Sequence, residues 1–199
     1  MVVIIKNKEL ISVGVLALQG AFREHINCIK KCGADAVEIK FPYQLKEIDG
    51  LIIPGGESTT INKLIKKYDF KPYLDEFYKS GKAIYGTCAG LILIAKKVAN
   101  EDFGLGYIDV EVARNLYGRQ IDSFEEYITL GFNGGEKFKA IFIRAPKILS
   151  AGPDVDILSE IKDNIILASQ DNVLVSTFHP ELQDDTRIHE YFLNMIEKS

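Results

Sequence analysis

A cysteine at a predicted corner between a strand and a helix is the leading candidate nucleophile of this chain. Cys88 is the middle residue of Gly-Thr-Cys-Ala-Gly at 86–90, between the apolar residues 83–85 and 91–95. Such a corner projects its side chain toward the free N–H groups of the next helix. The helix N-terminus also favours the nucleophilic thiolate over the thiol. From these five residues alone, a buried cysteine beside packing glycines is the alternative.

A cysteine nucleophile needs a base, and the chain has three histidines. His179 follows the strand-like residues 173–178 and stands two residues before Glu181. Residues two apart in an extended segment face the same side, so the carboxylate can fix the tautomer of the imidazole and stabilise its protonated form. His25 and His189 each neighbour a glutamate in a charged helical stretch, and this pattern favours a solvated helix face for both.

The sequence Pro-Gly-Gly-Glu-Ser-Thr-Thr at residues 54–60 is the second informative loop. Its two glycines allow backbone N–H groups to approach a ligand closely, and Ser58 or Thr59 can cap the following helix. The loop lacks the lysine and spacing of a Walker motif, so nucleotide binding gains little support. Stabilising an oxyanion at Cys88 is the better use for its N–H donors, with a structural turn as the alternative.

The composition indicates a sizeable core and argues against several classes of protein. The 199 residues are 47% hydrophobic and carry a net charge of −4, which gives no reason to expect nucleic acid as a partner. The first apolar run is too short for a signal peptide, and no run approaches membrane-spanning length. Three cysteines without a C-x-x-C pair favour neither disulfides nor zinc, so a reducing cytoplasm fits best.

Cys28 and Cys32 lie four residues apart on a predicted helix, where both can face one side. That spacing suits two metal ligands. Without further ligands at metal-like spacing, packing or idle thiols are favoured, and no metal site is predicted.

Strands and helices alternate along the first half of the chain. The predicted strands are residues 13–18, 36–39, 50–53 and 83–85, and the predicted helices are residues 22–31, 58–67 and 71–79. This alternation predicts parallel strands joined by right-handed crossovers. Ligands bind such sheets at the carboxyl ends of the strands, where Cys88 and the turn at 54–56 both lie.

The second half is richer in strands. Residues 106–175 contain short β-rich runs separated by turn residues, and residues 186–197 form a predicted closing helix. We therefore expect an antiparallel or mixed portion in addition to the parallel strands. No repeat or linker marks a boundary, so the fold class predicted is α/β: a single-domain three-layer sandwich over residues 1–199, with a mostly parallel central sheet and helices on both faces.

Together these loops resemble the triad-type, or class I, glutamine amidotransferases. In that class a cysteine in a G-x-C-x-G elbow is the nucleophile and a later H-x-E supplies the base and its orienting carboxylate; Cys88, His179 and Glu181 match these positions. Further motifs resemble one subfamily, the glutaminase subunit of pyridoxal 5′-phosphate synthase. These motifs are residues 18–25, 54–60, 86–90, 114–115, 118–125, 142–146 and 178–182.

The resemblance implies a flavodoxin-like fold and hydrolysis of L-glutamine to L-glutamate and ammonia through a thioester on Cys88. It implies no cofactor in this chain. The ammonia would pass to a separate synthase subunit, a (β/α)8 barrel that builds pyridoxal 5′-phosphate in a large hetero-oligomer. Backbone N–H groups of Ala89, Gly55 and Gly56 would hold the oxyanion. The residues implied around bound glutamine are Gly56, Glu57, Ser58, Arg114, Ile143 and Arg144.

The resemblance also implies that the synthase subunit activates the glutaminase. Our hypothesis is that docking reorients the Gly55-Gly56 peptide or Gln19 and so completes the oxyanion hole. Two departures from the family pattern do not touch the chemistry: an N-terminal extension at residues 1–11 and a variable turn at 133–136.

Three alternatives stay open at this point. Another triad glutaminase could feed a different acceptor, although the motifs at 118–125 and 142–146 argue against it. A cysteine peptidase or related hydrolase could share the elbow, and ammonia release from free glutamine but not from peptides would exclude it. A non-catalytic interaction subunit could retain the fold, although all three triad residues are present.

Overall fold

A seven-stranded sheet forms the centre of the computed structural model, which describes residues 5–6, 9–114, 123–132 and 134–198. Its strands are β3 (Ser12–Leu16), β4 (Asp35–Ile39), β5 (Gly50–Ile53), β6 (Ala83–Thr87), β12 (Asp156–Ile161), β13 (Asn164–Gln170) and β14 (Val173–Ser176). They are arranged in the order β12-β13-β14-β6-β5-β3-β4. The strands from β14 to β4 run parallel, whereas β12 and β13 are antiparallel. The predicted mixture of parallel and antiparallel strands is confirmed.

The middle strands are apolar because layers of helices cover both of their faces. Every residue of β5, β6 and β14 is buried. A strand covered on both sides needs a continuous apolar run rather than alternation, and this is the pattern that the sequence shows there. The predicted bounds 50–53 match β5, whereas β6 runs two residues further than the predicted 83–85.

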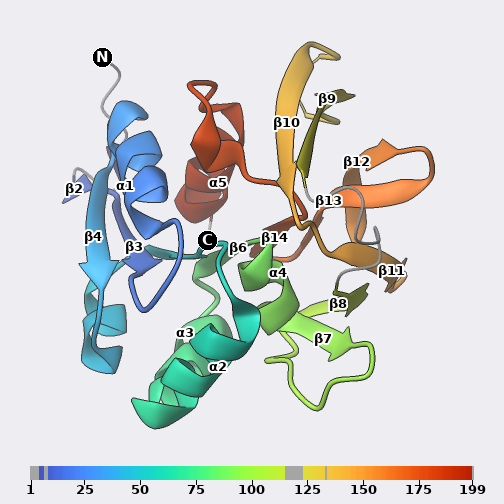
Figure 1. Ribbon diagram of the computed structural model, residues 1–199. Helices are drawn as coiled ribbons and strands as arrows, with labels where there is room; N and C mark the ends of the chain where they lie inside the picture. The colour runs from blue at the N-terminus through green and yellow to red at the C-terminus, as the bar shows by residue number, and fades with distance from the viewer. Residues whose placement is uncertain (1–4, 7–8, 115–122, 133, 199) are drawn as a thin grey trace.

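Helices cover the two faces of the sheet (Figure 1). The helices are α1 (Phe22–Lys31), α2 (Ser58–Lys67), α3 (Phe70–Lys79), α4 (Ala89–Ile94) and α5 (Arg187–Lys198). One core contains buried side chains of α1 and α5, including Ile29 and Phe192. The other contains those of α2, α3 and α4, including Ile61 and Leu74. The predicted three-layer α/β sandwich is confirmed.

Smaller strands and two 3-10 turns complete the described structure. They are β1 (Ile5–Lys6), β2 (Glu9–Leu10), η1 (Pro42–Glu47), β7 (Ala95–Val98), β8 (Ile108–Ala113), β9 (Ser123–Thr129), β10 (Lys137–Ile143), β11 (Lys147–Ala151) and η2 (Pro180–Leu182). The strands pair as β11-β8-β7, as the β9-β10 hairpin and as β1-β2. Figure 1 shows the hairpin and the β11-β8-β7 sheet at one end of the molecule, beside β12 and β13. Among the described helices, none is long and apolar enough to cross a membrane.

Two predicted strands are longer than those in the structure, and both end where a functional loop begins. The strand predicted at 13–18 corresponds to β3, which ends at Leu16, after which the chain bends into α1. The strand predicted at 173–178 corresponds to β14, which ends at Ser176, whose hydroxyl donates to the carbonyl of Phe178 at 3.1 Å. Apolar side chains continue beyond each strand because these loops are themselves packed into the core.

Candidate active site

Cys88 occupies the predicted elbow between β6 and α4. It is the residue just before the helix and adopts φ 47° and ψ −100°, an uncommon conformation for a residue with a side chain. Its N–H donates to the carbonyl of Ser176 in β14 at 2.9 Å. The small neighbours are required by space, since a Cβ on Gly90 would lie 1.9 Å from the carbonyl oxygen of Ile53. The corner is therefore fixed from both neighbouring strands.

His179 and Glu181 form a buried pair. Nδ1 of His179 lies 2.8 Å from Oε1 of Glu181, and the side-chain exposures are 9% and 0%. The spacing argument assumed that the two residues lie on an extended strand, but in the structure they do not. Pro180 begins η2 directly after His179, and this 3-10 turn brings the carboxylate to Nδ1 of the ring. The predicted pairing is therefore present, but with a different local geometry.

The nucleophile and base candidates lie against each other at the carboxyl ends of β6 and β14. Burial lowers the pKa of His179, but hydrogen bonds to Cys88 and Glu181 together with their charges raise it to about 10. These interactions favour the protonated, imidazolium form of His179. Gly55 closes this corner, since a Cβ there would lie 2.4 Å from Cε1 of His179 and 3.4 Å from Cβ of Cys88.

A buried histidine also contacts the carboxylate of Glu181. Burial alone would raise the pKa of Glu181, but its interactions with His25 and His179 keep that pKa below its ordinary value. Nε2 of His25 lies 3.4 Å from Oε2 of Glu181. The prediction of solvated helix faces for His25 and His189 is wrong, because both histidines are 0% exposed. Their helices α1 and α5 pack on the sheet with these residues turned inward.

A pocket of about 350 Å³ opens over Cys88 and His179. Every residue predicted to bind glutamine or to hold the oxyanion lines this pocket. These residues are Gly55, Gly56, Glu57, Ser58, Ala89, Arg114, Ile143 and Arg144. Sequence reasoning missed five further lining residues, Gly20, Ala21, Ile92, Pro146 and Leu182. Four of the five belong to motifs that the sequence had already singled out, and those motifs were the signal available for them: Gly20 and Ala21 lie in 18–25, Pro146 in 142–146 and Leu182 in 178–182.

The candidate oxyanion donors lie in two backbone segments. Ala89 is the first residue of α4 and is buried beside Cys88. The carbonyl oxygen of Gly55 accepts from the N–H of Ala21 at 3.0 Å, and this bond fixes the orientation of the Gly55-Gly56 peptide. Gln19 secures the next peptide, since its Oε1 accepts from the N–H of Glu57 at 2.7 Å.

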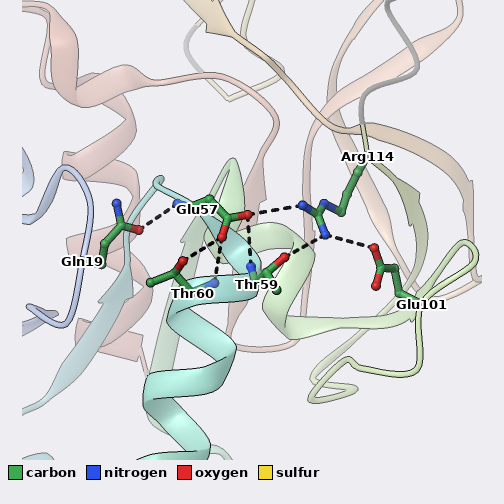
Figure 2. A network of polar contacts seen from close by, with 6 residues as sticks. All are labelled: Gln19, Glu57, Thr59, Thr60, Glu101 and Arg114. Atoms are coloured by element: carbon green, nitrogen blue, oxygen red, sulfur yellow. Dashed lines mark hydrogen bonds and ion pairs between the residues drawn. The ribbon is translucent and has the colours of Figure 1, made fainter.

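Glu57 and Arg114 form the centre of a polar network at the rim of the pocket (Figure 2). Glu57 caps α2 by accepting from the N–H groups of Thr59 and Thr60, so the predicted cap at Ser58 or Thr59 is wrong. Burial alone would raise the pKa of Glu57, but the hydrogen bonds from Thr59 and Thr60 together lower it. Its carboxylate also accepts from Arg114, and the two side chains lie 3.3 Å apart.

Arg114 is held on three sides. Its guanidinium donates to Glu57, to Oγ1 of Thr59 at 3.1 Å and to Oε1 of Glu101 at 3.0 Å. Figure 2 shows Thr59 and Glu101 on opposite sides of this guanidinium. Glu101 was not singled out from the sequence, because nothing near it in the chain indicates a contact with residue 114.

Ile143 and Arg144 reach the pocket from the end of β10. Both are exposed, and Arg144 adopts φ 44°. The carbonyl oxygen of Ile143 lies 3.9 Å from Sγ of Cys88. Much of the predicted motif at 118–125, and Asn115, lies outside the described residues, which resume with β9 at Ser123.

Cys28 and Cys32 are buried, free thiols on α1. Burial raises the pKa of Cys28 to about 11 and that of Cys32 to about 12. Both therefore remain protonated thiols at neutral pH, as packing residues would.

A cysteine on a strand-to-helix elbow beside a buried His–Glu pair, at the carboxyl ends of parallel strands, is the arrangement expected of a hydrolase with a cysteine nucleophile. The chain belongs to the SNO glutamine amidotransferase family, which matches residues 15–198.

Similar proteins extend this result. A pyridoxal 5′-phosphate synthase subunit PdxT of Bacillus licheniformis is 54% identical, covering 95% of this chain and 96% of that protein. A protein of the same name from Shouchella clausii is 56% identical, covering 92% and 94%. A crystal structure of a glutamine amidotransferase aligns with a TM-score of 0.87 at 43% identity, covering 92% and 98%. PurLQS from Thermotoga maritima, at a TM-score of 0.70 and 17% identity, shares the fold.

Proposed function

We propose that Cys88, His179 and Glu181 are the catalytic triad by which this chain hydrolyses L-glutamine to L-glutamate and ammonia. The observation that carries the proposal is the elbow cysteine lying against an imidazole whose other nitrogen is 2.8 Å from a buried carboxylate. A nucleophile, a base and an orienting group in contact are the requirement for covalent acyl transfer.

The reaction proceeds in two halves. The Cys88 thiolate attacks the side-chain amide carbon, and the N–H groups of Ala89 and the Gly55-Gly56 segment stabilise the oxyanion. The C–N bond then breaks as His179 donates its proton to the departing ammonia. Water next attacks the glutamyl thioester while His179 takes one of its protons, and the thiolate leaves as glutamate is released. Glu181 orients the imidazole throughout.

The amino-acid end of glutamine fits the charged rim of the pocket. Its ammonium is matched by Glu57 and its carboxylate by Arg114 or Arg144, with Gly56, Ser58 and Ile143 completing the wall. Glu57 and Arg114 are paired with each other before substrate binds. Binding of glutamine thus replaces the ion pair between Glu57 and Arg114 with two ion pairs to the substrate, one at its ammonium and one at its carboxylate.

The names of the relatives support a role in making pyridoxal 5′-phosphate, the active form of vitamin B6. We infer that the ammonia passes to a synthase subunit with a (β/α)8 barrel in a large hetero-oligomer in the cytoplasm. In this arrangement residues 1–199 act as a single domain with residues 1–11 as an extension. The coenzyme is made on the partner, and this chain itself uses no cofactor.

Activation by the partner requires a movable part of the oxyanion hole. Gln19 and the Gly55-Gly56 peptide are the candidates, since a hydrogen bond joins each of them to the loop opposite. Ammonia release from glutamine should therefore rise when the synthase subunit is added. Equal turnover with and without that subunit would refute gating while leaving the triad intact.

Covalent trapping tests the nucleophile directly. A diazo-ketone analogue of glutamine should label the peptide that contains Cys88 and abolish ammonia release. Cys28 and Cys32 are internal controls, because their raised pKa values keep them unreactive. Labelling of those cysteines with Cys88 unmodified would contradict the assignment.

A further inference from the structure

Two fully buried histidines lie behind the triad, and the reaction steps above do not use them. His25 comes from α1 and His189 from α5, and their Nδ1 and Nε2 atoms lie 2.9 Å apart. Nε2 of His25 is 3.1 Å from Oγ1 of Thr87 and 3.4 Å from Oε2 of Glu181. Thr87 directly precedes Cys88 in the chain. The pair thus joins two helices to the catalytic corner.

The proton in the hydrogen bond between His25 and His189 determines whether Nε2 of His25 is a donor or an acceptor. Burial lowers the pKa of both histidines, that of His189 to about 3, so both are neutral. A neutral ring carries one N–H, and the bond between the two rings needs one proton. If His25 supplied it from Nδ1, its Nε2 lone pair would face the carboxylate of Glu181. Within the described part of the chain, Nδ1 of His189 would then be a buried donor without a partner.

The opposite arrangement satisfies more groups. If Nε2–H of His189 donates to Nδ1 of His25, then Nε2–H of His25 faces Oε2 of Glu181 and Oγ1 of Thr87. The group left without a partner is then an acceptor on His189, and buried unpaired acceptors are less rare than unpaired donors. The geometry therefore favours His189 as the group that sets the tautomer of His25.

Glu181 needs such a donor. Its Oε1 is paired with His179, but Oε2 is buried and, among the described residues, has no hydrogen-bond partner, with Nε2 of His25 at 3.4 Å. The groups that face His25 are Glu181 from η2, Thr87 from β6 and His189 from α5, with the ring of Tyr85 at its edge. The charges of His179 and Glu24 also act on it. Of the carboxylates among these groups, Glu181 is the buried one.

We propose that His25, with its tautomer set by His189, is a positioning residue that directs its Nε2–H at Oε2 of Glu181. It thereby keeps Oε1 aimed at His179. Two imidazoles then hold one carboxylate, one on each oxygen, and the triad extends to a buried fourth member. This role rests on the triad chemistry proposed above, because it acts through Glu181 and touches neither substrate nor Cys88.

Substitution of His25 by leucine and by glutamine separates positioning from packing. His25→Leu removes the donor, whereas His25→Gln can place an amide N–H near the position of Nε2. With the synthase subunit present, kcat for ammonia release should fall about 10- to 100-fold in His25→Leu, with KM unchanged, and recover in part in His25→Gln. Ile29→Val, one turn along α1 and equally buried, is the matched control for packing.

A double substitution tests whether His25 acts through Glu181. In a Glu181→Gln background, His25→Leu should reduce kcat no further, because the carboxylate that it positions is gone. An equal additional loss in that background would show an effect through packing and would overturn the proposal. Wild-type kcat in folded His25→Leu would overturn it as well.

A readout without glutamine keeps this test separate from the proposed activity. The rate at which iodoacetamide alkylates Cys88, followed on its own peptide, reports the thiolate beside His179. At neutral pH this rate should fall in His25→Leu and less in His25→Gln. If His25→Leu does not fold, His189→Leu should give the same fall by releasing the tautomer. Unchanged alkylation in the folded variants would refute the positioning role even if the protein proved not to hydrolyse glutamine.

Discussion

At the scale of single residues, the carboxylate of Glu181 controls the charge state of its neighbour. Its hydrogen bond and charge help to raise the pKa of His179 to about 10. Below that value the ring carries its proton, which the departing ammonia requires.

Glu181→Gln should therefore lower the pKa of His179 and move the alkaline limb of kcat/KM to lower pH. The pH profile of ammonia release measures this shift. Asp184→Asn is the control, because Asp184 stands three residues away as an exposed partner of Lys31. An alkaline limb at the same pH in Glu181→Gln would show that the carboxylate does not act on His179.

Glu101 is a second residue that is expected to act on the site through a neighbour, in this case through Arg114. It accepts from Arg114 at 3.0 Å at the rim of the pocket, on the side away from Glu57. Glu101→Gln should loosen the guanidinium and raise KM for glutamine about threefold, with kcat unchanged, the loss expected of a partly exposed ion pair at the surface. Steady-state kinetics check this, with Glu160→Gln, an exposed acid on β12, as the control. A fall in kcat at constant KM would contradict a role confined to substrate binding.

At the scale of elements, the approach of α4 to β5 fixes the elbow. An added Cβ at Gly90 would lie 1.9 Å from the backbone oxygen of Ile53, which a rotating side chain cannot relieve. Gly90→Ala should lower the free energy of unfolding by about 3 kcal/mol or more. Gly81→Ala is the comparison, because its φ is 79° but its nearest neighbour is 3.6 Å away, and it should cost about 1–2 kcal/mol. Urea unfolding that ranked the two substitutions in the opposite order would contradict this account.

Local sequence patterns predicted the elements well and their contacts incompletely. The expected helices 22–31 and 58–67 match α1 and α2, since an amphipathic face and the breaks around it are local features. The fate of His25 is not local, because its partner lies 164 residues away on another helix. Charged neighbours predicted exposure for His25, whereas the packing of α1 on the sheet turns His25 inward together with Cys28 and Ile29. The pocket residues that were predicted around Cys88 each belong to a motif, whereas Ile92, which lies in none, was missed.

At the scale of the whole molecule, the site is a meeting point of distant segments. The carboxyl ends of β5, β6 and β14 supply the turn at 54–56, Cys88 and the loop to His179, and β10 adds Ile143. The loops at the ends of the central strands therefore provide the whole proposed triad, as expected for ligand sites on parallel sheets. The β-rich second half adds one wall of the pocket.

The buried histidines also couple the stability of the whole molecule to pH. Burial lowers the pKa of His25 and His189, the latter from 6.5 to about 3. Below pH 6.5 the unfolded chain binds protons that the folded chain does not, so the free energy of unfolding falls as pH drops. Carboxylates, with ordinary values near 4.5, add to this loss at lower pH. His179 has a raised pKa, and its opposite contribution is lost as pH rises above 6.5.

His189→Gln should flatten this dependence between pH 6.5 and 4.5, the ordinary pKa values of histidine and glutamate. The slope of unfolding free energy should decrease by about 1.4 kcal/mol per pH unit, the equivalent of one proton. Urea unfolding across this range measures the slope. A loss of stability that is the same at every pH shifts the curve to lower free energy and leaves its slope unchanged. Asn194→Gln, exposed on the same helix, is the control without a titrating group. Parallel curves for wild type and His189→Gln would mean that His189 is protonated in the folded protein, which would also undo the tautomer that it imposes on His25.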